Sequence, residues 1–198
     1  MNAFIALEKY IVKQEKEFGI GVPVTLDEDI AMYESQRKKN VQSYNNWLLI
    51  NIPGNNFFID AAKSINEQSD DILNVLMDKK FILSLFVHEG RTLLEDMGNR
   101  FKGENVKEET DRIFDEFAKE KYDFLFKFSS GLDLFNFVNS KCKNHDKGKS
   151  SALLYSHGIK GFTYQDETGD RLFLFNAKKD ISPLEYRSAS LIDSKLIS

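Results

Sequence analysis

The stretch that decides the fold is GFTYQDETGDRLFLF, residues 161–175. Large apolar side chains alternate with polar ones before a short Asp-Glu-Thr-Gly segment, residues 166–169, and a continuous apolar run over residues 172–175 follows it. Alternation with a period of two and short apolar runs are both typical of strands, and a glycine-containing break between two such segments is typical of a turn. The sequence therefore predicts a β-hairpin, with one strand around Phe162 and Tyr164 and the other over residues 171–175.

Upstream of the hairpin, residues 47–52 (WLLINI) form an apolar run that Pro53 and Gly54 close. This pattern predicts a buried strand, and we expect it to share one central sheet with both hairpin strands. Residues 22–25 and 57–59 are expected to be shorter extended pieces, the first because proline disfavours a helical residue before it.

Helices are predicted around these strands. The apolar spacing between Phe4 and Phe18 suggests an amphipathic helix that Gly19 ends. Asp27 and Ser69 each precede a run of helical spacing, so both are expected to be N-caps.

Four further segments complete the expected secondary structure. Residues 81–87 fit a buried helix or a buried strand equally well. Residues 122–128 alternate aromatic and other side chains, which predicts a strand. A helix is expected from Leu132 onward, and a short one that Ser150 or Ser151 caps and a left-handed glycine, Gly158, closes.

Residues 99–121 carry opposite charges four positions apart, such as Lys107 with Asp111 and Arg112 with Glu116. Such pairs support a solvated amphipathic helix. We expect a helical insertion at about 99–121 that protrudes from the core or lies across it, so that its deletion leaves the sheet folded. Partner binding through its exposed face is the less favoured interpretation of the same pattern.

Strands cluster late in this order of elements rather than alternating regularly with helices. That arrangement favours an α+β class over a regular parallel α/β wrap. With 198 residues and no internal repeat, a single domain over residues 1–198 is expected.

Composition excludes several classes of protein. With 41% hydrophobic and 29% charged residues, the chain is expected to be globular rather than disordered. A net charge of −4 disfavours broad nucleic-acid binding, which needs a basic face. The longest apolar runs are too short to span a bilayer, and no secretory signal is evident, so no membrane partner is expected. The single cysteine, Cys142, rules out an intramolecular disulfide and suits the cytoplasm.

Few residues combine into a recognisable catalytic or metal-binding motif. His88, His145 and His157 lie in no metal-ligating spacing, so no metal is expected. His157 is expected to favour a helix C-terminus as a cation. Cys142 could act as a nucleophile only if a histidine approached it in space, and a lone cysteine is more often buried and inert.

The acidic pair Asp166-Glu167 is the strongest candidate for a catalytic site because of its setting at the end of an apolar strand. A carboxylate there could polarise a hydroxyl or stabilise a cationic transition state. It could equally form the turn, since aspartate in a tight turn accepts hydrogen bonds from the backbone just ahead of it.

Three stretches of the chain can be compared with a known family. They are LLYSHGIKGFTYQDETGDRLFLFNAKKDI (residues 153–181), LLINIPGNNFFIDAAKSINEQ (48–68) and SGLDLFNFV (130–138). Together they resemble ADP-ribosyltransferase-like domains of phage and mobile-element polyvalent proteins, including a small anti-CRISPR transferase. They follow the family's order and cover a third to a half of the chain. The resemblance implies an ADP-ribosyltransferase-like central sheet with flanking helices.

The resemblance also implies a site. Asp166 matches the catalytic acidic position, with Glu167 beside it. Active members hold the nicotinamide ribose with a histidine or arginine near the N-terminus, whereas no His or Arg precedes Arg37 here. An aromatic that stacks on the nicotinamide is replaced by Pro23.

The function expected from these matches and departures is that of a phage or mobile-element protein in the host cytoplasm. It would bind and inhibit a host protein, such as a defence complex, without a cofactor. The alternative is an active mono-ADP-ribosyltransferase that uses NAD through a divergent site. A second alternative is a structural or injected accessory protein of the virion. For the first of these, we expect that replacing Asp166 and Glu167 by alanine leaves the fold intact.

Overall fold

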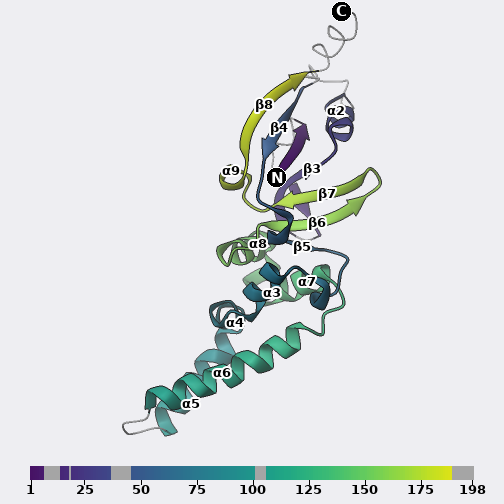
Figure 1. Ribbon diagram of the computed structural model, residues 1–198. Coiled ribbons are helices and arrows are strands. Elements are labelled where there is room, and N and C mark those ends of the chain that lie inside the picture. Colours follow the sequence, from purple (N-terminus) through teal and green to yellow (C-terminus); the bar gives the residue numbers. More distant parts are fainter. Residues whose placement is uncertain (7–13, 18, 37–45, 101–105, 189–198) are drawn as a thin grey trace, which may run out of the picture.

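The computed structural model describes residues 1–6, 14–17, 19–36, 46–100 and 106–188 (Figure 1). Within these residues the protein is elongated, with a twisted sheet at one end and a group of helices at the other (Figure 1). The class is α+β, as the sequence predicts.

The sheet is mixed and open, with strand order β5-β6-β7-β3-β1-β4-β8, and β2 pairs with β3 beside this path. The β5–β6 pair is parallel and the other pairs are antiparallel. The strands are β1 (Asn2–Ala6), β2 (Gln14–Lys16), β3 (Gly19–Thr25), β4 (Asn46–Asn51), β5 (Phe58–Asp60), β6 (Gly161–Asp166), β7 (Gly169–Leu174) and β8 (Ser182–Ser188).

The hairpin prediction is confirmed. Asp166 at the end of β6 pairs with Gly169 at the start of β7, so only Glu167 and Thr168 lie between the paired residues. Gly169 has φ +127°, which a side chain would strain. β4 belongs to the same sheet as both hairpin strands, which confirms that the three segments share one sheet.

The helices of the described residues are α2 (Glu28–Gln36), α3 (Asp70–Met77), α4 (Lys79–Leu85), α5 (Val87–Arg100), α6 (Val106–Leu125), α7 (Gly131–Lys141), α8 (Lys147–Ser156) and the short α9 (Ala177–Asp180). Single 3-10 turns lie at Asn55–Phe57, Ile65–Glu67 and Lys143–His145. The predicted caps Asp27 and Ser69 accept backbone N–H groups of Ile30 and Ile72, respectively.

Two hydrophobic clusters occupy opposite faces of β7. Phe173 points into a cluster formed with helices α3, α4, α7 and α8, which also takes Phe162 from β6. Leu172 and Leu174 point into a second cluster formed by β1, β3, β4 and α9. Because alternate residues of a strand face opposite ways, β7 is buried on both sides and connects the two clusters.

Both edges of the sheet carry features that discourage further strand pairing. At β5, the buried Gln68 side chain accepts the N–H of Asp60 at 2.8 Å and donates to its carbonyl at 3.0 Å. This amide satisfies backbone groups at the outer edge of β5. At β8, Pro183 and a register irregularity against β4 interrupt the edge, and both devices are typical of protected edge strands.

The helix predicted between Phe4 and Phe18 is wrong over the described part of that range, which contains β1 and β2. Residues 7–13 and 18 lie outside the described residues. β1 lies between β3 and β4 and buries Ala3 and Ile5 while Phe4 is half-buried on the other side. A central strand buried on both faces loses the polar alternation that identifies a strand in sequence.

The strand predicted over residues 122–128 is also wrong, because α6 continues to Leu125. Its aromatics meet at helical spacing: Tyr122 contacts Phe126 and Phe124 contacts Phe128, with ring centroids 4.1 and 5.5 Å apart. When aromatic side chains lie on several sides of one end of a helix, their spacing in the sequence resembles the two-residue period of a strand.

Two smaller predictions are settled by α4 and α8. Residues 79–85 are helical, so the apolar run there is a helix rather than a strand. Asp146, not Ser150 or Ser151, caps α8. The two serines are buried inside α8, and Ser151 accepts the N–H of Ile20 at 3.0 Å, which fastens the helix to β3.

The expected insertion at about 99–121 includes residues 101–105, which lie outside the described residues. The rest is helical, and α5 and α6 extend away from the sheet (Figure 1). The inner half of α6 is not peripheral, because Phe117 and Ala118 pack on the larger cluster and Leu125 is fully buried in it. Deleting 99–121 would therefore remove two side chains that pack on the core.

No helix in the described parts of the chain has the length and apolar character needed to cross a membrane.

Candidate functional site

Asp166 is held by the hairpin turn that it ends. Its Oδ1 accepts the backbone N–H of Thr168 at 2.9 Å and also the Thr168 hydroxyl. An aspartate carboxylate that accepts the backbone N–H two residues ahead defines an Asx turn. The expectation that Asp166 can serve as a turn former is therefore confirmed.

Arg171 engages the same carboxylate from the opposite strand. Its Nε donates to Asp166 Oδ2 at 3.1 Å, and its Nη2 donates to Glu34 Oε1 of α2 at 2.6 Å and to the Thr168 hydroxyl at 2.7 Å. Only 3% of the Arg171 side chain is exposed. A buried guanidinium with two carboxylate partners ties the hairpin to α2.

The charges in this group determine the protonation of Asp166. Burial disfavours its ionised form, but hydrogen bonds from Thr168 and the charge of Arg171 outweigh burial, and the pKa of Asp166 lies below its usual range. Asp166 is therefore ionised at neutral pH. Both of its oxygens accept hydrogen bonds from protein groups, while 35% of its side chain remains exposed. Glu167, the other candidate acid, is exposed and forms no hydrogen bond or ion pair within the described residues.

Beside this group lies a cavity of about 920 Å³. Tyr164 lines it, and burial together with the negative charge of Asp166 raises the pKa of Tyr164 to about 12. The wall is formed by Lys16, Glu17, Leu26, Asn55, Asp60, Ala61, Ala62, Lys63, Leu132, Thr163, Tyr164, Gln165, Asp170, Arg171 and Leu172. Its volume lies in the range of small-molecule sites, and its ionisable groups balance, with three basic and three acidic side chains.

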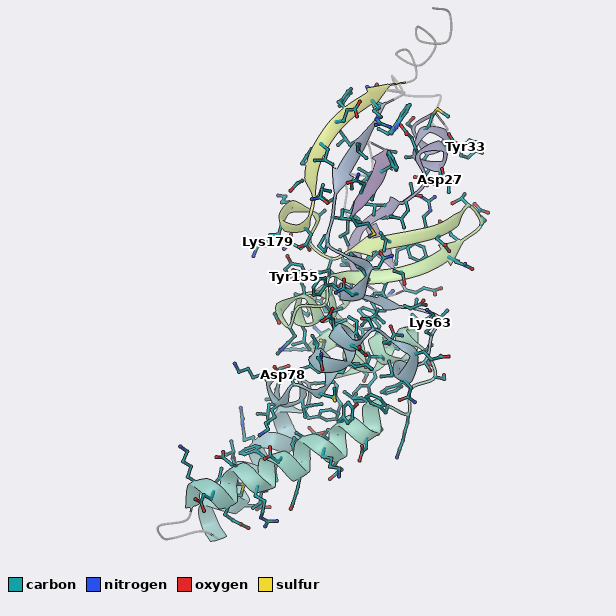
Figure 2. All side chains as sticks on the ribbon, viewed as in Figure 1. Asp27, Tyr33, Lys63, Asp78, Tyr155 and Lys179 are labelled. Atoms are coloured by element: carbon teal, nitrogen blue, oxygen red, sulfur yellow. The ribbon has the colours of Figure 1, made fainter. Side chains whose placement is uncertain are left out.

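The loop at residues 60–68 forms one wall of the cavity and is rigidly built. Ser64 and Glu67 form a capping box, and the buried Gln68 amide holds the backbone of Asp60 and Lys63. Lys63 lies on the same side of the molecule as the hairpin tip (Figure 2). The polar residues at 64–68 therefore maintain the shape of the loop.

The first turn of α7 closes the loop from the other side. Gly131 and Leu132 donate their N–H groups to the carbonyls of Lys63 and Ala61. A Cβ on Gly131 would lie 2.3 Å from the carbonyl oxygen of Asp60. Only glycine permits this approach, and the leading N–H groups of α7 are already used by protein acceptors.

Pro23, at the position where the resemblance requires an aromatic, lies inside β3 opposite Phe173. On the other side of β3, β2 pairs as far as Gly21 and β1 pairs at Thr25. Pro23 occupies the gap between these two partners, where a missing N–H removes no ladder bond. It is not among the residues that line the cavity.

The histidines and the cysteine do not assemble into a site. His157 ends α8 ahead of Gly158, whose φ of +101° confirms the predicted left-handed residue. The expected cation is wrong, because burial lowers the pKa of His157 against the opposing charge of Asp78. Its Nε2 lies 3.0 Å from the Ser84 hydroxyl, which itself donates to the carbonyl of Phe81.

Cys142 follows α7 and is half-buried as a free thiol. The described residues contain no group of three or more His, Cys, Asp or Glu placed to hold a metal ion.

Sequence reasoning found Asp166 and its turn but missed its partners. In the sequence, Arg171 is the polar residue at the start of an apolar strand. Its partner Glu34 lies 137 positions away from it in the chain. The only local signal was an arginine five residues after an aspartate across a two-residue turn, which places both at one end of a hairpin.

Comparison of the chain with family models, with curated proteins and with solved structures gives no match.

Proposed function

We propose that this chain is an ADP-ribosyltransferase-like protein of a phage or mobile element. It binds a host protein and inhibits it without catalysing a reaction. The proposal rests on the resemblance of three sequence stretches. It also rests on the hydrogen-bond partners of Asp166, the acid that the resemblance marks as catalytic. A host defence complex in the cytoplasm is the partner that the resemblance suggests.

The observation that carries the non-catalytic part of the proposal is the engagement of Asp166. Both of its oxygens have protein partners, Thr168 on one side and Arg171 on the other. A catalytic acid must be able to exchange partners with substrate as charge develops. Asp166 instead stabilises the turn and the buried Arg171, which gives the residue a structural reason to be present.

The arrangement of the three resembling stretches supports the fold part of the proposal. Each contributes to the wall of the same cavity: Asp60 from residues 48–68, Leu132 from 130–138, and Tyr164 from 153–181. The first strand of the chain, β1, is central in the sheet, and active members of the family also begin with a strand. Stretches that are distant in sequence thus meet at one place.

The cavity favours the alternative of an active transferase. It is large enough for a small-molecule ligand and includes Arg171, the partner of Asp166. The residues that would clamp NAD in active members have no counterpart here, since Pro23 replaces the stacking aromatic. A carboxylate without such a clamp supplies only part of the stabilisation that opening the glycosidic bond requires.

The experiment that separates the two functions combines label transfer with inhibition. Asp166→Asn keeps the Oδ1 acceptor of the turn and removes the charge, so it perturbs the fold less than alanine does. We expect purified protein to transfer no label from NAD to host extract. We also expect Asp166→Asn to change inhibition of a host defence system by less than threefold, where loss of an essential catalytic acid costs about a hundredfold or more.

Glu167→Gln, at the exposed neighbour, is the matched control. Label on a host protein that disappears in Asp166→Asn but persists in Glu167→Gln would establish the transferase and overturn the binder.

A further inference from the structure

One nitrogen of the buried Arg171 side chain is left without a protein partner. Nε and Nη2 donate to Glu34, Asp166 and Thr168. Nη1 donates to no acceptor among the residues that the structure describes, although only 3% of the side chain is exposed. A guanidinium carries N–H donors on all three nitrogens, and a buried donor without an acceptor costs free energy. The two N–H groups of Nη1 are therefore available to an acceptor that the described chain does not supply.

Nη1 of Arg171 is reached from the cavity beside the hairpin. Within the described residues, one side-chain nitrogen or oxygen is both fully enclosed and without a hydrogen-bond partner, and it is Oδ2 of Asp180. Nη1 is therefore not enclosed. Because Arg171 lines the cavity of about 920 Å³ and is otherwise buried, its unused donors face that cavity.

The charges around Arg171 disfavour a charged ligand. Oε1 of Glu34 and Oδ2 of Asp166 lie 2.6 and 3.1 Å from the guanidinium nitrogens, so two carboxylates already face one positive charge. An anion at Nη1 would be placed close to both carboxylates and repelled by them. A cation would offer Nη1 no acceptor. The other ionisable groups of the wall balance, so an uncharged acceptor suits the cavity best.

The wall also offers apolar surface to such a ligand. Leu26, Leu132 and Leu172 line the cavity together with Ala61 and Ala62. Leu26 is 42% exposed, so a ligand can remove apolar area of this side chain from water. A cavity that combines apolar walls with a few polar groups of fixed direction is typical of a small-ligand site.

We infer that this cavity binds an uncharged ligand whose carbonyl oxygen accepts the N–H groups of Arg171 Nη1 and whose apolar part covers Leu26. The main chain of a partner protein and a free small molecule can both supply this chemistry. The inference goes beyond the proposed function, because it assigns a class of ligand to the cavity.

Three matched compounds test the charge requirement. N-acetyl-leucine methylamide is uncharged, N-acetyl-leucine ends in a carboxylate, and leucine methylamide begins with an ammonium group. Each is titrated into the isotope-labelled full chain while NMR follows the backbone amides of residues 60–63 and 163–165, which line the cavity. The uncharged compound should shift these signals to saturation, and both charged analogues should bind about fivefold or more weakly. Equal binding of all three would overturn the inference.

Two arginine variants test the donor. Arg171→Lys keeps the positive charge and removes Nη1, so it should weaken binding of the uncharged compound about tenfold. Arg187→Lys is the control, because Arg187 also has two carboxylate partners, Glu28 and Glu185, but does not line the cavity. It should change binding less than about twofold. Equal losses in the two variants would contradict a role for Nη1.

Two leucine variants keep the test decisive if Arg171→Lys fails to fold. Leu26→Ala leaves the buried charges in place and should weaken binding about threefold through lost apolar contact. Leu184→Ala removes a leucine that is 55% exposed in β8, outside the cavity, and should change binding less than about twofold. Equal effects of these two variants would overturn the inference.

The source of the carbonyl is decided by ligand length. Acetyl-Ala-Leu-Ala methylamide should bind about tenfold more tightly than the single blocked leucine if a partner's main chain is the ligand, and equally tightly if a small molecule is. Neither NAD nor a host target enters these titrations. Absence of binding would refute this inference and leave the proposed function intact, whereas transfer of label from NAD would refute the proposed function alone.

Discussion

Arg171 is the residue on which the candidate site depends. Its burial between Glu34 and Asp166 explains both why the hairpin tip is held against α2 and why the candidate acid is engaged. The sequence identified Asp166 because turn chemistry is local. It could not identify Arg171, because the burial of an arginine depends on a partner brought by the tertiary fold.

Replacing Arg171 by methionine should lower the free energy of unfolding by about 3 kcal/mol, because two carboxylates lose their buried counter-charge. Urea denaturation measures the change. Arg112→Met, which removes an exposed arginine with two carboxylate partners, should lower the free energy of unfolding much less, because solvent screens surface ion pairs. Equal losses would show that Arg171 contributes no more than a surface ion pair.

The lowered pKa of His157 predicts that the free energy of unfolding depends on pH. Its pKa in the folded state is lowered by burial, so below about pH 6.5 the unfolded chain takes up a proton that the folded protein does not. The free energy of unfolding should therefore fall as the pH is lowered from 7 to 5. His157→Gln should reduce this slope, whereas His88→Gln, at an exposed position, should not. An NMR titration that places the pKa of His157 above 6.5 would contradict the account.

At the scale of elements, turn and cap residues decided which ones the sequence predicts. The residues around Gly169 separate the hairpin strands and Pro53 and Gly54 close β4, so these strands are identified although β7 is buried on both faces. β1 is also buried on both faces, but no glycine or proline follows it before Gly19, and it was misread as helix. β8 (SPLEYRS) was missed altogether, because an exposed edge strand needs few apolar residues.

The close contact between α7 and β5 predicts that a larger residue at Gly131 destabilises the protein. Gly131→Ala places a methyl group 2.3 Å from the backbone oxygen of Asp60, which cannot move without shifting β5. The free energy of unfolding should fall by about 2 kcal/mol or more, although alanine favours helix.

Gly148→Ala in α8 is the control, because its nearest neighbour is the movable carboxylate of Asp146 at 3.1 Å. It should change the free energy of unfolding by less than about 1 kcal/mol. A neutral Gly131→Ala would mean that α7 and the loop at residues 60–63 are not in close contact.

At the scale of the whole molecule, one strand connects two cores. In β7, Phe173 packs in the cluster formed with the helices, and Leu172 packs in the cluster formed with the rest of the sheet. The elongated shape (Figure 1) suggests two parts, but this shared strand predicts that they unfold together.

Trp47, the single tryptophan, reports on the sheet, and far-ultraviolet circular dichroism reports mainly on the helices. The two probes should give coincident denaturation curves. Leu172→Ala and Phe162→Ala, one in each core, should each shift both curves together by about 3 kcal/mol. Separate transitions would show that the helical part and the sheet fold independently.

The central claim is that Asp166 is a structural acid in a protein that acts by binding. Calorimetric titration with NAD tests it most directly, since a transferase must hold NAD before any chemistry. The account predicts no heat beyond dilution up to millimolar NAD, for the native chain and for Asp166→Asn alike. Saturable binding to the native chain that Asp166→Asn weakens would contradict it.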